Sequence, residues 1–84
     1  MRVGTQFTGR LPAGQSGRWF THSWPSDWHV TWYFMPTTPA PGAPELEWEV
    51  EVERASASAV TYWLTVRNLS SAPMDFEGRY AVLN

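Results

Sequence analysis

From Glu45 to Arg54 the chain reads Glu-Leu-Glu-Trp-Glu-Val-Glu-Val-Glu-Arg, and polar and apolar residues alternate without a break up to Glu53. A period of two is the pattern of a β-strand with one face in a core and the other in water. A helix would spread the same side chains around its whole circumference. We therefore predict a strand with five glutamates on its outer face and, on its buried face, Leu46, Trp48, Val50 and Val52.

A similar alternation predicts strands on both sides of this one, at 2–9, 18–24, 28–35, 60–69 and 74–82. Segments rich in glycine, proline and small polar residues separate them; the stiffest contains four prolines and spans 36–44. No helical period, heptad or internal repeat competes with this pattern. Residues 1–84 are thus predicted to form a single all-β domain, a small antiparallel β-sandwich or compact barrel of six to seven strands.

The glutamate strand also predicts how the last strands pair. Placing buried residues against buried residues sets Val50 opposite Tyr62 or Leu64, because a slip of one residue would bury the glutamates. We expect the C-terminal half to be a three-stranded meander with 60–69 as its middle strand.

One residue of the middle strand breaks the expected division between wet and buried faces. Trp63 has the parity opposite to that of Tyr62 and Leu64, so its indole is expected to face outward. In one register of the meander Arg79 lies over this indole as a cation–π contact. An outward indole between charged neighbours suits stacking on a sugar ring or packing in a subunit interface. Coverage by a loop of the same domain is the competing interpretation.

Composition limits how the core can be built and held. A chain of 84 residues buries only about 60–65% of its surface, and the six Trp, four Phe and three Tyr supply much of the apolar area. Cysteine is absent, which excludes disulfides and thiolate metal sites. Lysine and isoleucine are absent too, and this bias favours a GC-rich bacterial origin.

Charge and hydropathy exclude two classes of partner. The net charge is −2 and the six basic residues are scattered, so we expect no nucleic-acid partner. The longest uncharged run, Val30 to Pro44, is broken by prolines and is not expected to span a membrane. No signal peptide is expected at 1–15. A removed leader, an extracellular location and excision from a longer chain stay open, so the cellular location is not predicted.

The sequence predicts no catalytic residue, metal or cofactor. Carboxylates on one strand face lie about 6.5–7 Å apart, as in some glycosidases, but these project in parallel and we interpret them as a solvated face that discourages edge pairing. His22, Asp27 and His29 are the only residues resembling a zinc ligand set. Strand parity disfavours convergence of the two imidazoles, and no nucleophile elbow is present.

The turn Trp24-Pro25-Ser26-Asp27-Trp28-His29 carries the residue types of a binding site. Two flat indoles and directional polar groups are what a carbohydrate site needs. The competing interpretation has both indoles folded inward as caps of the core. For contact with a second copy of the chain, the candidate apolar residues are Trp19, Tyr33 and Met35.

The segment Phe7-Thr-Gly-Arg-Leu-Pro-Ala-Gly-Gln-Ser-Gly-Arg-Trp-Phe20 resembles the opening strand-turn-strand of bacterial extracellular accessory modules of the pre-peptidase C-terminal type. The resemblance implies a non-catalytic β-sandwich attached to a secreted enzyme. The acidic calcium-site pattern of many such modules is missing, and no functional residue carries over.

We hypothesise a non-enzymatic, lectin-like module that binds carbohydrate through Trp24, Asp27, Trp28, His29, Trp63 and Arg79. The alternative is a self-associating structural subunit without a small-molecule ligand.

Overall fold

The computed structural model describes residues 1–84, which form six antiparallel strands and no helix. The strands are β1 (Arg2–Leu11), β2 (Ser16–Pro25), β3 (Val30–Pro36), β4 (Leu46–Arg54), β5 (Ala59–Asn68) and β6 (Met74–Val82). The predicted all-β class and the positions of all the predicted strands are confirmed. The structure has no apolar helix of membrane-spanning length.

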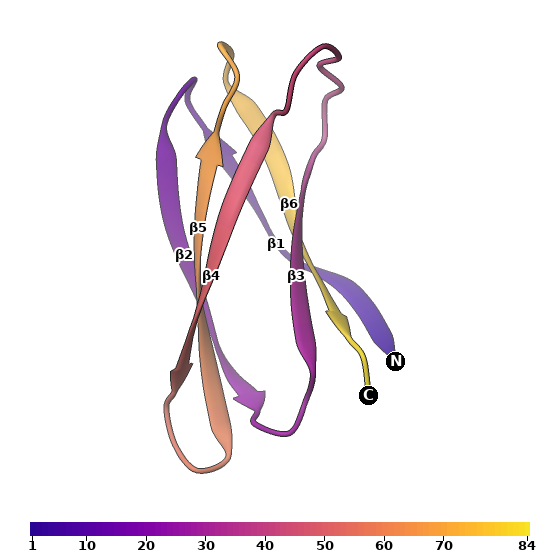
Figure 1. Ribbon diagram of the computed structural model, residues 1–84, viewed down its shortest axis with the longest axis vertical. Coiled ribbons are helices and arrows are strands. Elements are labelled where there is room, and N and C mark those ends of the chain that lie inside the picture. The colour runs from indigo at the N-terminus through magenta and orange to yellow at the C-terminus, as the bar shows by residue number, and fades with distance from the viewer.

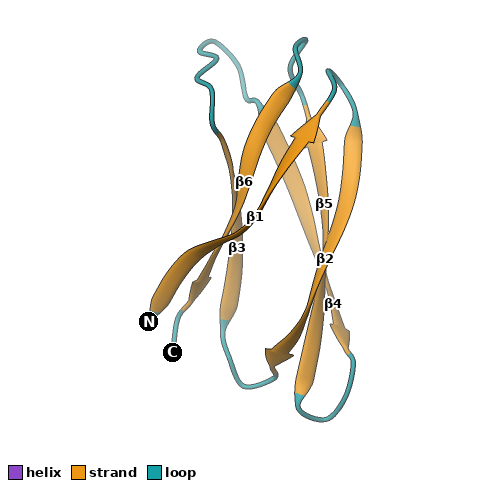
Figure 2. Cartoon of the chain, turned by 180° about the vertical axis from the view of Figure 1, so that it is seen from behind, coloured by secondary structure: helices purple, strands orange, loops and turns teal.

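Two three-stranded sheets pack face to face as a β-sandwich (Figures 1 and 2). Sheet A has the order β1-β6-β3, and sheet B has the order β2-β5-β4. The proline-rich segment 36–44 crosses from sheet A to sheet B, as its prolines favour. Only the β4–β5 connection joins two strands of the same sheet.

The predicted C-terminal meander is wrong. β5 pairs with β2 and β4, whereas β6 lies between β1 and β3 in the other sheet. The alternation of β6 shows that it buries one face, but it does not show which neighbours hydrogen-bond to its edges. The predicted β4–β5 register is confirmed, since Val50 lies opposite Leu64 and the glutamates stay on the outer face.

Aromatic rings from both sheets fill the core. One group surrounds Trp24, which meets the Trp32 and Tyr80 rings edge-to-face at centroid distances of 5.5 and 5.2 Å. A second group surrounds Phe76, whose ring lies so close to Gly9 that a Cβ there would be 2.5 Å from it. Glycine at this inner position of β1 is therefore required by the close approach of a ring.

A β-bulge in β2 inverts the parity expected from alternation. Thr21 pairs with Tyr62 and Trp24 pairs with Val60, so His22 and Ser23 together face one residue of β5. Ser23 has a positive φ of 67°. The extra residue turns Trp24 onto the buried face, although simple alternation had placed it on the side of Phe20.

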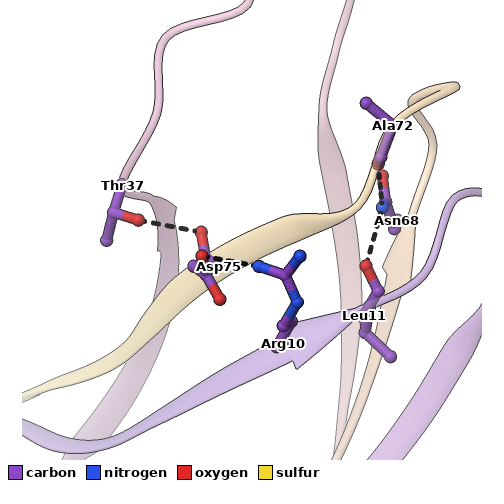
Figure 3. Close-up of polar contacts among 6 residues, drawn as sticks. All are labelled: Arg10, Leu11, Thr37, Asn68, Ala72 and Asp75. Atoms are coloured by element: carbon purple, nitrogen blue, oxygen red, sulfur yellow. Dashed lines mark hydrogen bonds and ion pairs between the residues drawn. The ribbon is translucent and has the colours of Figure 1, made fainter.

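Asn68 ties two loops together at one end of the sandwich. Its side chain is fully buried, and its Nδ2 donates to the carbonyl oxygens of Leu11 and Ala72 at 3.2 and 2.8 Å (Figure 3). The Pro12 carbonyl oxygen also lies 3.2 Å from Nδ2. Its Oδ1 accepts from the backbone N and the hydroxyl of Ser70 at 2.9 and 2.7 Å. Nearby, Arg10 pairs with Asp75 at 2.9 Å. One buried amide thus holds the β1–β2 and β5–β6 connections in place.

The inner face of β4 is less buried than predicted. Trp48, Val50 and Val52 point toward the core side but keep 37%, 40% and 63% of their surface exposed. β4 is an edge strand, and it swings away from β3 toward its C-terminal end (Figure 1). Only Leu46, at its start, is half-buried against the core.

Candidate functional site

An aromatic surface lies on the outer face of sheet B. Phe20 is 57% exposed, and its ring centroid lies 5.1 Å from that of Trp63 with an interplanar angle of 32°. The His22 ring follows on the other side of Phe20, at 6.2 Å and 34°. We call His22, Phe20 and Trp63 the outer aromatic strip.

Charged side chains frame one end of this strip. The Arg18 guanidinium lies 4.7 Å from the Trp63 ring centroid, and it donates to Glu51 at 3.0 Å. The Trp63 indole N–H donates to Glu53 at 2.7 Å. These contacts hold the indole in one orientation on an open surface, where a cation–π contact is worth about 0.5–1 kcal/mol.

The outward orientation predicted for Trp63 is confirmed, but the cation over its ring is Arg18 and not Arg79. Arg79 lies on the outer face of sheet A, where it pairs with Glu77 at 2.9 Å. The error follows from the meander, because that prediction placed β6 beside β5. The true neighbour on that side is β2.

A hollow beside the strip adds polar groups to it. Its lining includes Gln6, Thr21 and His22 together with the Phe20 ring. The His22 Nδ1 lies 2.9 Å from the hydroxyl of Ser23, the bulge residue. The bulge therefore sets the position of the imidazole next to the exposed phenyl ring.

The predicted carbohydrate site at the β2–β3 turn does not assemble. Trp24 is buried and donates its indole N–H to the Thr21 hydroxyl at 2.9 Å. Trp28 is half-buried, with the Arg2 guanidinium 4.4 Å from its ring centroid. Trp24 thus follows the interpretation in which the indoles cap the core.

The polar residues of this turn are held by the C-terminus. The Asn84 side chain accepts from the His29 backbone N at 2.8 Å and donates to the Asp27 carbonyl at 3.0 Å. Both contacts are to the backbone, while the side chains of Asp27 and His29 are exposed. No group of three or more His, Cys, Asp or Glu residues is placed to hold a metal ion.

The predicted interface residues separate into two sets. Trp19 is half-buried and packs inside the sandwich, stacked on Phe7 at 5.9 Å and edge-to-face with Phe76 at 5.3 Å, so its main contacts are with its own core. Tyr33 and Met35 are exposed on the outer face of sheet A. With Val3 across the sheet, they line a shallow apolar groove.

Sequence reasoning missed Phe20 and Arg18 as neighbours of Trp63, and His22 beside Phe20. The parity of Phe20 opposite Trp19 was a usable signal, but assembling the strip also requires the pairing of β2 with β5. Comparison of the chain with known protein families, curated proteins and solved structures finds no match.

Proposed function

We propose that this protein is a non-enzymatic carbohydrate-binding module whose ligand lies on the outer aromatic strip. The observation that carries the proposal is the exposed Phe20 ring beside Trp63, at a small tilt and on a rigid sheet face. The C–H face of a pyranose stacks on such rings, and its hydroxyls need directional donors and acceptors at the edge.

The groups at the edge of the strip suit sugar hydroxyls. Arg18 offers guanidinium N–H donors that Glu51 already orients, so little rotamer freedom is lost on binding. The second oxygens of Glu51 and Glu53 face solvent as acceptors, because each carboxylate has a single hydrogen-bond contact, through Oε1. His22 and Gln6 supply further polar groups on the far side of Phe20.

Charge narrows the sugar class. Next to the strip lie one positive charge, on Arg18, and three negative charges, on the carboxylates of Glu49, Glu51 and Glu53 on the outer face of β4. The local potential is negative and disfavours uronic or sulfated glycans. Neutral or amino sugars are therefore the preferred ligands. The resemblance of residues 7–20 to non-catalytic accessory modules points in the same direction.

Two exposed aromatic residues provide a matched test. Phe20 lies on the outer face of sheet B, while Tyr33 lies on the outer face of sheet A with a similar exposure of 50%. We expect titration calorimetry with neutral and amino-sugar oligosaccharides to detect binding by the native chain. Phe20→Ala should weaken it at least tenfold and Tyr33→Ala should leave it unchanged. Absence of binding to every such oligosaccharide, or equal losses in both variants, would refute the proposal.

A second candidate function is self-association through the outer face of sheet A. It is favoured by the exposure of Tyr33, Met35 and Val3 around one apolar groove. For this function the test and the control are reversed. Tyr33→Ala should weaken self-association, and Phe20→Ala should leave it unchanged. Light scattering over a range of concentrations measures this, and a strict monomer at millimolar concentration contradicts it.

A further inference from the structure

β4 leaves both its backbone edge and part of its apolar face without a partner. It pairs with β5 on one side and has no strand on the other. On the neighbouring strand β5, Leu64 and Tyr62 are buried on the inner face of the sheet. Their cross-strand partners on β4, Val50 and Val52, are exposed. The only aromatic contact between β3 and β4 joins Phe34 and Trp48, at 5.5 Å. Sheet A therefore covers the start of β4 and not its later half.

We infer that the free edge of β4 is a docking site for an extended segment of another protein in which basic and apolar residues alternate. A strand added there would satisfy the free N–H and C=O groups of the edge. Its apolar side chains would lie on the core side and cover Val50 and Val52. This inference does not rest on the carbohydrate proposal, because the outer aromatic strip lies over β2 and β5.

A second copy of β4 is a poor occupant. Directly opposite residues of antiparallel strands point to the same face, as Glu51 and Trp63 do across β4 and β5. A β4–β4 pair would therefore set glutamate against glutamate, which is destabilising. A shift of one residue would instead turn the glutamates of the second copy onto the apolar face, at a desolvation cost.

The charges of β4 specify the occupant. Its outer face carries Glu47, Glu49, Glu51 and Glu53 in one row. Two of them have weak or exposed ion pairs, Glu47 with Arg67 at 3.7 Å and Glu51 with Arg18 at 3.0 Å, and Glu49 has none. Arginine or lysine at alternate positions of the added strand would face this row. Because exposed ion pairs contribute little energy, the charges select the partner while backbone bonds and apolar contacts hold it.

Three short peptides test the inference on the intact protein. They are Arg-Val-Arg-Val-Arg-Val-Arg, its acidic counterpart with glutamate for arginine, and a basic peptide of the same composition with its valines grouped together. We expect only the alternating basic peptide to shift the backbone amide signals of β4 in NMR spectra. Val52→Arg, which places charge on the apolar side at an exposed position, should weaken that binding at least tenfold.

Charge reversal provides the decisive variant. The double substitution E47K/E49K changes two exposed glutamates, one without an ion pair and one in a long pair with Arg67 at 3.7 Å. It leaves two lysines and two glutamates in the row, so it should remove the preference for the basic over the acidic peptide. Glu77→Lys, on the other sheet, is the matched control and should change nothing. Equal binding of both basic peptides, signal shifts outside β4, or dimerisation through β4 in light scattering with cross-linking would each overturn the inference. The wild-type comparison of the peptides decides the question even where a variant fails to fold.

Discussion

Asn68 makes the most concentrated set of polar contacts in the structure, so replacing it is the sharpest test of what holds the loops. Asn68→Ala removes three contacts that share the two N–H groups of Nδ2, and two hydrogen bonds to Oδ1. A net contribution of about 1 kcal/mol for each of these four bonds sets an upper bound of roughly 4 kcal/mol. In the variant, water can hydrogen-bond to the part-buried carbonyls of Pro12 and Ala72, whereas the contact at the Leu11 carbonyl is buried. We expect a loss of about 3 kcal/mol in the free energy of unfolding, which lowers Tm by roughly 12–24 °C in a domain of this size.

Urea denaturation followed by tryptophan fluorescence measures this loss, with thermal melts as a second reading. Ser70→Ala is the control, because it removes only contacts of the Ser70 hydroxyl in the same loop. It should cost about 1 kcal/mol. If Asn68→Ala loses less than about 1 kcal/mol, or no more than Ser70→Ala, the buried amide is not what fixes these loops.

Three further predictions concern the core and the ends of the chain. Gly78→Ala should destabilise by about 1–3 kcal/mol in denaturant titrations, because the new Cβ would lie 2.6 Å from the Phe7 ring; a neutral result contradicts this packing. Burial raises the pKa of Tyr62 above its ordinary value, so its contribution to stability is present below about pH 10 and is lost as the pH rises further. Tyr62→Phe should therefore lose less stability than the native chain between about pH 9 and pH 11, and identical profiles in alkaline melts would argue against the shift. Arg2→Ala should cost about 0.5–1 kcal/mol through the lost contact with Trp28, whereas Arg67→Ala, with its exposed 3.7 Å ion pair, should cost close to nothing in the same thermal melts.

The strands and their faces were predictable because a period of two is a local property of the chain. The alternation around Val50 predicted the element and limited its partner to Tyr62 or Leu64, and the structure pairs it with Leu64. The order of strands was not predictable in this way, since β6 presents the same alternation whether it pairs with β5 or with β1. Burial of Val52 was overestimated for a related reason: an inward side chain is buried only where the opposite sheet extends over it.

The candidate site was predictable only in part. Trp63 followed from parity alone, because its strand is regular on both sides. Its cation did not, since Arg18 reaches the indole through the pairing of β2 with β5, and that pairing has no short-range signal. The bulge at His22 and Ser23 was also missed, because no glycine marks its positive φ. It moved Trp24 into the core and removed the predicted turn site.

The connections that cross between the sheets have a consequence for folding kinetics. Only β4 and β5 form a local hairpin, whereas sheet A joins the first strand to the last, with Arg2 opposite Val82. Such long-range pairing slows folding to milliseconds or longer, because loop closure must come before the contacts that offset it. During synthesis, sheet A cannot form until β6 has left the ribosome. Until then β1 and β3 lack the strand with which both pair, while the glutamates of β4 discourage pairing at the free edge of the β4–β5 hairpin.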